Sequence, residues 1–331
     1  MSKVDAVAAI LWIAVTFYAV FGGADFGAGF WDLVSGGVAG EGPRERISHS
    51  LAPVWEANHV WLIFALVVLW TGFPDAFAAV MTTLYVPLTL AALGIVLRGS
   101  GFAFRKELRE TPWRRWAGLA FSLSSVLTPF FMGTVVGAIA DGRVPADGDG
   151  DAFSSWTGPL SLMVGVLFVA AGAYLAAVFL VIDSRNARQG ELERYFARRA
   201  IGAAIVAGLA AIAGLVVLHS DARPLYDGLT GEGLPLVILS VVCGAGALVM
   251  LLSGARLGLR PLAVGAVAAV IWGWAAAQYP ALLPGEMTIE AGAAASGALT
   301  ALIVVFGAAV LVVVPALALL YWLSQRRAFE D

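Results

Sequence analysis

Residues 5–34 read DAVAAILWIAVTFYAVFGGADFGAGFWDLV, an apolar run interrupted near its end by a glycine-flanked aspartate. About 20 apolar residues are enough for an α-helix to cross a membrane. Further apolar runs follow along the chain, each bounded by polar or helix-breaking residues. Together the predicted spans are 5–34, 51–73, 76–98, 115–140, 156–182, 200–219, 233–253, 260–281 and 296–323. We therefore predict an all-α integral membrane protein with about nine transmembrane helices.

The composition supports a helical membrane bundle and excludes several other classes of protein. Of the 331 residues, 60% are hydrophobic and 13% are charged, whereas a soluble domain carries about 25% charged residues. A membrane β-barrel would show segments of about 10 residues with alternating polarity, and none occur. The net charge of −3 does not indicate a nucleic-acid partner, and the single Cys243 excludes a disulfide framework and a cysteine metal site.

The distribution of basic residues predicts how the chain lies in the membrane. With nine spans, 17 of the 20 Lys and Arg residues fall on the face that holds the C-terminus, and only Lys3, Arg143 and Arg223 fall on the other. The positive-inside rule then places the N-terminus outside and the C-terminus in the cytoplasm. Because no A-x-A-like cleavage site follows residues 1–23, we expect a retained first helix instead of a signal peptide.

The spans are expected to form two four-helix groups and one peripheral helix. Residues 1–140 hold the first four spans and nearly all of the polarity inside the membrane. Residues 141–295 hold the next four, and residues 296–331 hold the last span with a cytoplasmic tail. A tight turn, Gly72-Phe73-Pro74-Asp75, joins the second and third spans and predicts an antiparallel pair of helices.

Three ionisable residues in the first group are candidates for function, because a charge at bilayer depth is costly and seldom accidental. Glycines on both sides of Asp25 allow a neighbouring backbone to approach closely. Glu56, at the start of the second span, shares a helical face with His59 three residues later, and Arg98 ends the third span. Span directions place all three at the cytoplasmic side, where carboxylates near an arginine and a histidine would suit a proton intake path.

Other interpretations of these residues remain open. Asp25 and Arg98 could form a structural ion pair that joins two helices, which is compatible with proton transfer. His59 could be a polar residue bonded to Glu56, a proton relay or, least of all, a haem ligand. No catalytic or metal-binding residue is predicted in this chain. A proton-coupled secondary transporter and a purely structural assembly subunit are the alternative functions; transporters usually show broken helices in both halves, whereas the glycine-flanked acid occurs only in the first.

Three ordered blocks of sequence resemble the signature blocks of subunit II of cytochrome bd-type quinol oxidases. These blocks are Gly23-Ala24-Asp25-Phe26-Gly27-Ala28-Gly29, Ala52-Pro53-Val54-Trp55-Glu56-Ala57-Asn58-His59-Val60-Trp61-Leu62-Ile63 and Arg98-Gly99-Ser100-Gly101-Phe102. The number of spans, the orientation and Pro315 in the last span also fit, so that the resemblance covers essentially the whole chain. The second half resembles the family mainly in its hydropathy.

The resemblance implies a multi-pass subunit of the cell membrane that forms a heterodimer with a haem-bearing subunit I. That partner would hold two b-type haems and haem d, and the complex would oxidise quinol and reduce dioxygen to water. Subunit II would ligate no haem. It would contribute a proton path through Glu56 and Asp25, with Asn58 and His59 as relay or orienting groups and Arg98 as charge partner.

The resemblance also places Trp61 near an oxygen route. Small accessory subunits, membrane lipid and quinone are further partners that it allows. Many members of the family carry aspartate at the Glu56 position and glutamine at the His59 position, so this chain resembles the branch that reads Trp-Glu-Ala-Asn-His.

Overall fold

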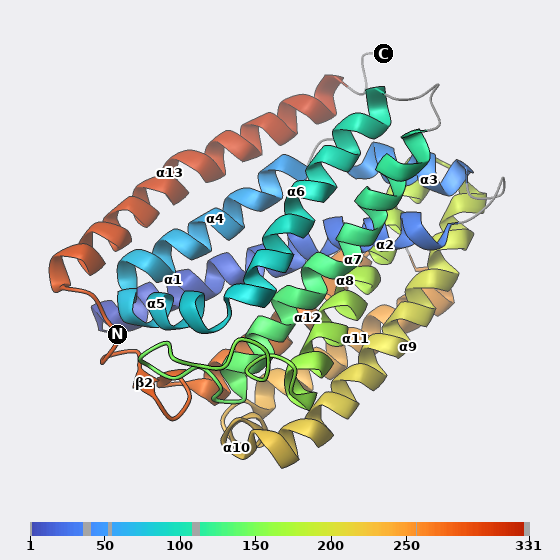
Figure 1. Cartoon of the computed structure of the whole chain (residues 1–331). Coiled ribbons are helices and arrows are strands. Elements are labelled where there is room, and N and C mark those ends of the chain that lie inside the picture. Colours follow the sequence, from blue (N-terminus) through green and yellow to red (C-terminus); the bar gives the residue numbers. More distant parts are fainter. Residues whose placement is uncertain (1, 36–40, 52–54, 108–112, 256, 328–331) are drawn as a thin grey trace.

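A computed structural model of the chain describes residues 2–35, 41–51, 55–107, 113–255 and 257–327. Most of these residues are helical, so that the predicted all-α class is confirmed. Within the described residues, the β-structure is one small antiparallel pair of strands, β1 (Ala281–Leu283) and β2 (Met287–Thr288). The long helices run side by side along one common direction (Figure 1).

The first predicted span is one rod built from three consecutive segments. It comprises α1 (Lys3–Phe17), the π-helical turn η1 (Tyr18–Gly22) and α2 (Gly23–Val34). The Ser2 and Asp5 side chains form a reciprocal capping box that satisfies backbone N–H groups at the start of α1. The rod Lys3–Val34 is long and apolar enough to cross a membrane.

The predicted hairpin between the second and third spans is only partly correct. After α3 (Glu41–Leu51), α4 (Trp55–Gly72) ends before Pro74, which begins α5 (Pro74–Thr83). Helix α5 turns away from α4 by 118°, and α6 (Tyr85–Glu107) then runs back alongside α4 (Figure 1).

The single helix expected over residues 76–98 is therefore wrong, because Leu84 leaves the helical conformation with φ −104° and ψ 26°. Pro87 explains the break: it lacks the N–H that would bond to the Thr83 carbonyl four residues earlier, and its ring crowds that carbonyl. In the first turn of α6, by contrast, the missing N–H costs nothing.

The remaining long helices overlap the predicted spans, although one of them begins ten residues earlier than predicted, and one short helix was not predicted. They are α7 (Trp113–Ala140), α8 (Pro159–Asn186), α9 (Gly190–Asp221), the short α10 (Arg223–Thr230), α11 (Leu234–Ser253), α12 (Leu259–Gln278) and α13 (Ser296–Arg327). In the described part of the chain, 6 helices are long and apolar enough to cross a membrane, and the bent pair α4–α5 would make 7. The count of nine spans and the division at residues 140 and 295 stay predictions.

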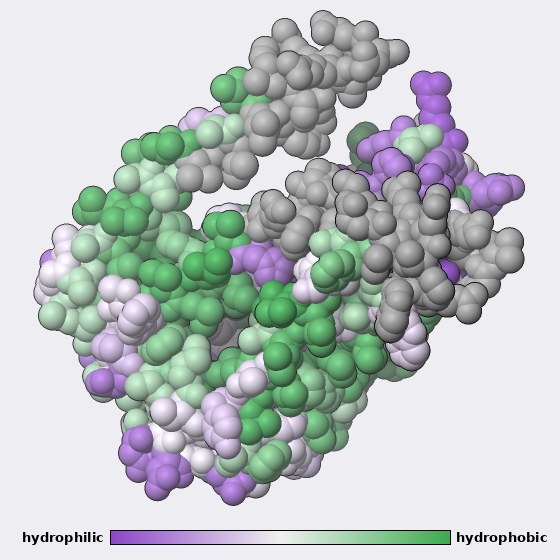
Figure 2. All heavy atoms as spheres, turned by 45° about the horizontal axis from the view of Figure 1, so that its top comes forward, coloured by the Kyte–Doolittle hydropathy of each residue, from purple (hydrophilic) through white to green (hydrophobic). Residues whose placement is uncertain are grey.

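Large apolar side chains cover the outside of the bundle, which is the reverse of a soluble protein. Val216 on α9, Val241 on α11 and Leu311 on α13 are 68%, 65% and 76% exposed. Figure 2 shows hydrophobic residues across the middle of one face and hydrophilic residues gathered towards its ends. Such a band of apolar surface is what a lipid bilayer covers.

Candidate functional site

The centre of the candidate site is a buried ion pair between α2 and α6. Arg98 Nη2 lies 2.6 Å from Asp25 Oδ1 and donates a second hydrogen bond to the Asp25 carbonyl oxygen at 3.1 Å. Arg98 Nη1 donates to Ser125 Oγ on α7 at 2.6 Å. The side chains of Arg98 and Asp25 are 3% and 1% exposed. The structure thus brings together the acid and the base that the sequence analysis paired.

Two aromatic rings lie close to the guanidinium group of Arg98. Its central carbon lies 4.9 Å from the centre of the Phe26 ring and 4.7 Å from the centre of the Phe121 ring. Cation–π attraction of this kind is worth about 2 kcal/mol where water is excluded. The charge is therefore stabilised by Asp25, by Ser125 and by two ring faces.

Glycines let the three helices approach closely enough for these contacts. A Cβ atom at Gly29 of α2 would collide with the Ser125 side chain, and one at Gly101 of α6 would lie 2.8 Å from the Ala117 carbonyl oxygen of α7. Close backbone approach through small residues is a common way for membrane helices to associate. The glycine-rich block around Asp25 therefore places the carboxylate within reach of α6 and α7.

Asn58 and His59 bring α4 to the same site. Asn58 is buried and its Nδ2 donates to the Phe21 carbonyl oxygen of η1 at 3.3 Å. The His59 ring lies edge-on to Tyr18 and to Phe26, with ring centres 6.4 Å and 6.2 Å apart. Phe26 therefore contacts both His59 and Arg98.

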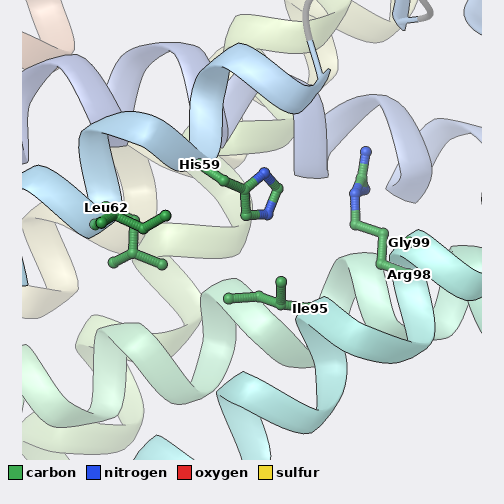
Figure 3. A pocket seen from close by; sticks show the side chains of 6 residues that line it. His59, Leu62, Ile95, Arg98 and Gly99 are labelled. Atoms are coloured by element: carbon green, nitrogen blue, oxygen red, sulfur yellow. The ribbon is translucent and has the colours of Figure 1, made fainter.

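A cavity separates α4 from α6 beside this ion pair. Its volume is about 340 Å³, and its lining is formed by His59, Leu62, Ile63, Ile95, Arg98 and Gly99. Figure 3 shows the His59 ring directed into this space from α4, while the Arg98 side chain leaves α6 and points past the cavity towards the first rod. His59 of α4 and Arg98 of α6 thus line the same cavity.

Glu56 and Trp61 complete the residues proposed from the sequence. Glu56 lies in the first turn of α4, and its side chain is outside the described part of the structure. Its contact with His59 therefore stays a prediction. Trp61 stacks on Phe17 of α1, with ring centres 4.4 Å apart, and lies edge-on to Phe64. These contacts place Trp61 against α1, and its role in an oxygen route stays a prediction.

Four polar residues that lie in or near the site were not predicted from the sequence. Asp32 on α2 is 4% exposed and accepts a hydrogen bond of 2.7 Å from Ser122 Oγ. Ser122 and Ser125 are three residues apart on α7, so that they share one face of that helix. The spacing of seven residues between Asp25 and Asp32 was a usable signal, because it places both carboxylates on one face of α2. Tyr18 is the fourth of these polar residues, and little in the sequence distinguishes it from the aromatic residues beside it.

The chemistry available at the site is proton binding by Asp25. One carboxylate oxygen, Oδ1, is fixed by Arg98, whereas Oδ2 is buried and has no hydrogen-bond partner among the described residues. A carboxylate oxygen in that position can accept a proton and become a donor. No group of three or more His, Cys, Asp or Glu side chains suited to a metal ion occurs in the part of the chain that the structure describes.

Comparison with known proteins gives one consistent result. The sequence model of the family described as "Cytochrome bd terminal oxidase subunit II" matches residues 4–324. "Cytochrome bd ubiquinol oxidase subunit 2" of Bacillus subtilis (strain 168) is 27% identical over 237 residues, which cover 70% of this chain and 68% of that protein. "Cytochrome bd-I ubiquinol oxidase subunit 2" of Escherichia coli (strain K12) is 29% identical over 210 residues, or 61% of this chain and 54% of the relative.

The fold has a solved counterpart as well. A chain in "The structure of bd oxidase from Geobacillus thermodenitrificans" superposes on this chain with a TM-score of 0.77 and 26% sequence identity. The superposition covers 98% of each chain. The likeness therefore extends over nearly the whole length, including the second half, in which sequence motifs are weak.

Proposed function

The chain belongs to the family of cytochrome bd terminal oxidase subunit II, and we propose that it supports a haem-bearing subunit I and supplies that partner with protons from the cytoplasm. It is a multi-pass membrane protein and a subunit of a terminal oxidase. In the proposed reaction, quinol is oxidised by the complex and dioxygen is reduced to water. Each oxygen atom reduced to water takes up two protons, and a path for them must cross part of the membrane.

The main support for the proton path is the burial and the hydrogen bonding of the Asp25 carboxylate. Its carboxylate is almost completely buried, yet only one of its oxygens is committed to Arg98. A charge at this depth is expensive, and membrane proteins that retain such groups commonly use them in proton relays. The path that we propose enters near Glu56 at the start of α4 and continues through Asn58, His59 and Asp25, with Arg98 holding the charge of Asp25.

We further propose that this chain ligates no haem, and that two b-type haems and haem d reside in subunit I. His59 is the histidine inside the bundle, and its ring is enclosed edge-on by Tyr18 and Phe26. His49 on α3 is exposed, and His219 lies near the end of α9, where its Nε2 is 2.6 Å from Arg223 Nη1. The three histidines therefore do not converge on one site.

The proposed orientation places the N-terminus outside and the C-terminus in the cytoplasm, with nine spans. It is supported by the split of basic residues and by the position of α13, which begins beside the start of α1 and runs to the opposite end (Figure 1). A reporter that is active only in the cytoplasm should therefore be active when it is fused after residue 331. Activity of an extracytoplasmic reporter at that position would contradict the orientation.

Replacement of Glu56 tests the proton path in the assembled oxidase. Glu56→Gln keeps the size and hydrogen-bonding capacity of the side chain but removes its titratable proton, whereas Glu56→Asp keeps the proton. We expect Gln to lower quinol-driven oxygen consumption by about tenfold or more, as loss of a positioned proton-transfer group does, and Asp to retain much of the rate. Haem content must match the wild type in both variants. A haem-replete Gln variant with wild-type turnover would contradict the path.

Bracing is the alternative role of the same residues, and it is favoured by the three hydrogen bonds that Arg98 donates to α2 and α7. A subunit that only braces the oxidase would tolerate Glu56→Gln without loss of turnover. Membership of the oxidase family argues against the secondary transporter. Accessory subunits and bound lipid or quinone stay predictions of the sequence analysis.

A further inference from the structure

Tyr18 stands at the one irregular turn of the first rod. Residues Tyr18–Gly22 form a π-helical turn between α1 and α2, and such turns occur frequently at functional sites. The Tyr18 ring lies over Gly22, at which a Cβ atom would be 2.9 Å from the ring carbon Cε2. Across the helix interface, the ring lies edge-on to His59. The turn therefore places a phenol between the first rod and α4.

The Tyr18 hydroxyl is buried in an unusual way. Its oxygen is shielded from solvent and finds no hydrogen-bond partner among the residues that the structure describes. The neighbouring aromatic residues of the run, Phe17 and Phe21, carry no hydroxyl and are 39% and 41% exposed. A phenylalanine would have filled the same space at position 18 without burying a polar group, and burying a polar group without a partner is destabilising.

A second buried atom in the same region also lacks a partner. Asp25 Oδ2 is the carboxylate oxygen that Arg98 does not bind. The Tyr18 ring lies over Gly22, three residues before Asp25, and the His59 ring that it contacts also contacts Phe26, the residue after Asp25. Buried polar groups in native proteins are nearly always paired with protein or with internal water. Two orphaned groups in one buried region point to a shared water.

We propose that the Tyr18 hydroxyl and Asp25 Oδ2 share an internal water molecule, and that this pair passes protons between His59 and Asp25. The proposal rests on the proton path described above and adds a residue to it. In this step the protonated imidazole of His59 forms a hydrogen bond to the phenol oxygen and gives it a proton, the phenol's own proton moves to the water, and the water gives one of its protons to Asp25 Oδ2. One proton moves in total, and Tyr18 and the water both end neutral. A hydroxyl suits this role because it donates and accepts at once.

The test is Tyr18→Phe in the assembled oxidase, with Tyr174→Phe as the matched control. Tyr174 on α8 is 5% exposed, and its hydroxyl also lacks a partner among the described residues, but it is not part of the site. Both substitutions remove one buried hydroxyl and keep the ring. We expect Tyr18→Phe to lower quinol-driven oxygen consumption by about tenfold and Tyr174→Phe to leave it at the wild-type rate.

The solvent isotope effect separates proton transfer from a structural role. When proton delivery limits turnover, the ratio of the rates in H2O and D2O should rise in Tyr18→Phe and stay unchanged in Tyr174→Phe. A general loss of packing would lower the rate without raising this ratio. Wild-type rate and isotope effect in a haem-replete Tyr18→Phe oxidase would overturn the inference.

Two comparisons distinguish a failure of the relay through Tyr18 from a failure of the whole proton path. If Glu56→Gln is slow while Tyr18→Phe behaves as Tyr174→Phe does, the relay through Tyr18 is wrong and the proton path stands. If Glu56→Gln also turns over at the wild-type rate, the path itself fails. Should Tyr18→Phe not assemble, infrared difference spectra of the wild-type oxidase decide: an ordered internal water gives an O–H band that shifts in H2 18O, and the absence of any such band would contradict the shared water.

Discussion

Two ion pairs of this chain share one chemistry but lie in opposite surroundings. Asp25 and Arg98 meet inside the bundle with side chains that are 1% and 3% exposed, and Arg223 and Asp227 meet on α10 with side chains that are 56% and 58% exposed. The N–O distances are 2.6 Å and 3.0 Å. Distance alone would rank the two pairs as similar.

The two ion pairs differ in the groups that surround the arginine. Around Arg98, the solvent is replaced by an acid, a serine, a backbone carbonyl and two aromatic rings. Around Arg223, water remains, and the pair joins residues one helical turn apart on the same helix. A buried pair is costly to break because the remaining charge is stranded, whereas an exposed pair contributes about 0–1 kcal/mol. We expect single substitutions to separate the two regions sharply.

The largest effect is expected for Asp25→Asn. The amide leaves the Arg98 guanidinium buried without a counter-charge, which should destabilise the subunit by about 3–5 kcal/mol and lower the yield of assembled oxidase. Thermal unfolding of the purified complex measures the loss. The double variant Asp25→Asn/Arg98→Met removes both charges and should recover part of the stability. A single variant as stable as the wild type would show that the pair is not a brace.

A smaller effect is expected for Gly27→Ala, which tests the close packing that surrounds the buried pair. A Cβ atom at Gly27 would collide with the Gly172 carbonyl oxygen of α8, so that α2 and α8 must separate. Overpacking of this kind costs about 1–3 kcal/mol. Gly208→Ala on α9 is the control, because nothing lies within 4 Å of a Cβ atom there. Equal melting temperatures for the two variants would contradict the role of close packing.

The fold was largely predictable because helix ends depend on local sequence. The spans predicted at 233–253 and 296–323 correspond to α11 (Leu234–Ser253) and α13 (Ser296–Arg327), since apolar runs and breakers mark them directly. The break at Leu84 was not predicted, because Pro87 lies inside the span predicted at 76–98 and many membrane helices contain proline. Whether a proline bends a helix or ends it depends on the neighbours that satisfy the freed carbonyl.

The site was predictable only where the cost of burial reveals a residue. Asp25 and Arg98 stand out because charges are rare in apolar runs, and the structure places them in contact. Asp32 lies close to the end of a predicted span, where an acid could reach water, and its burial against Ser122 depends on how α7 packs on α2. Tyr18 carries no charge and resembles the aromatic residues beside it. The contacts of Asp32 with Ser122 and of Tyr18 with His59 join different helices, so that spacing along one helix does not predict them.

The smallest effect is expected for Arg223→Ala. Arg223 donates to Asp227 Oδ1 at 3.0 Å and lies close to His219 and to the ring of Tyr226. All of these groups are at the solvent-exposed end of the bundle, where water replaces a lost partner and salt screens the charges. We expect a loss of at most about 1 kcal/mol, wild-type haem content and wild-type oxygen consumption. The same measurements as for Asp25→Asn apply, at low and at high salt, because any contribution of the exposed pair should shrink as salt is added. A loss as large as that of Asp25→Asn would mean that burial does not distinguish the two pairs, and that α10 is covered by a partner which excludes water from Arg223.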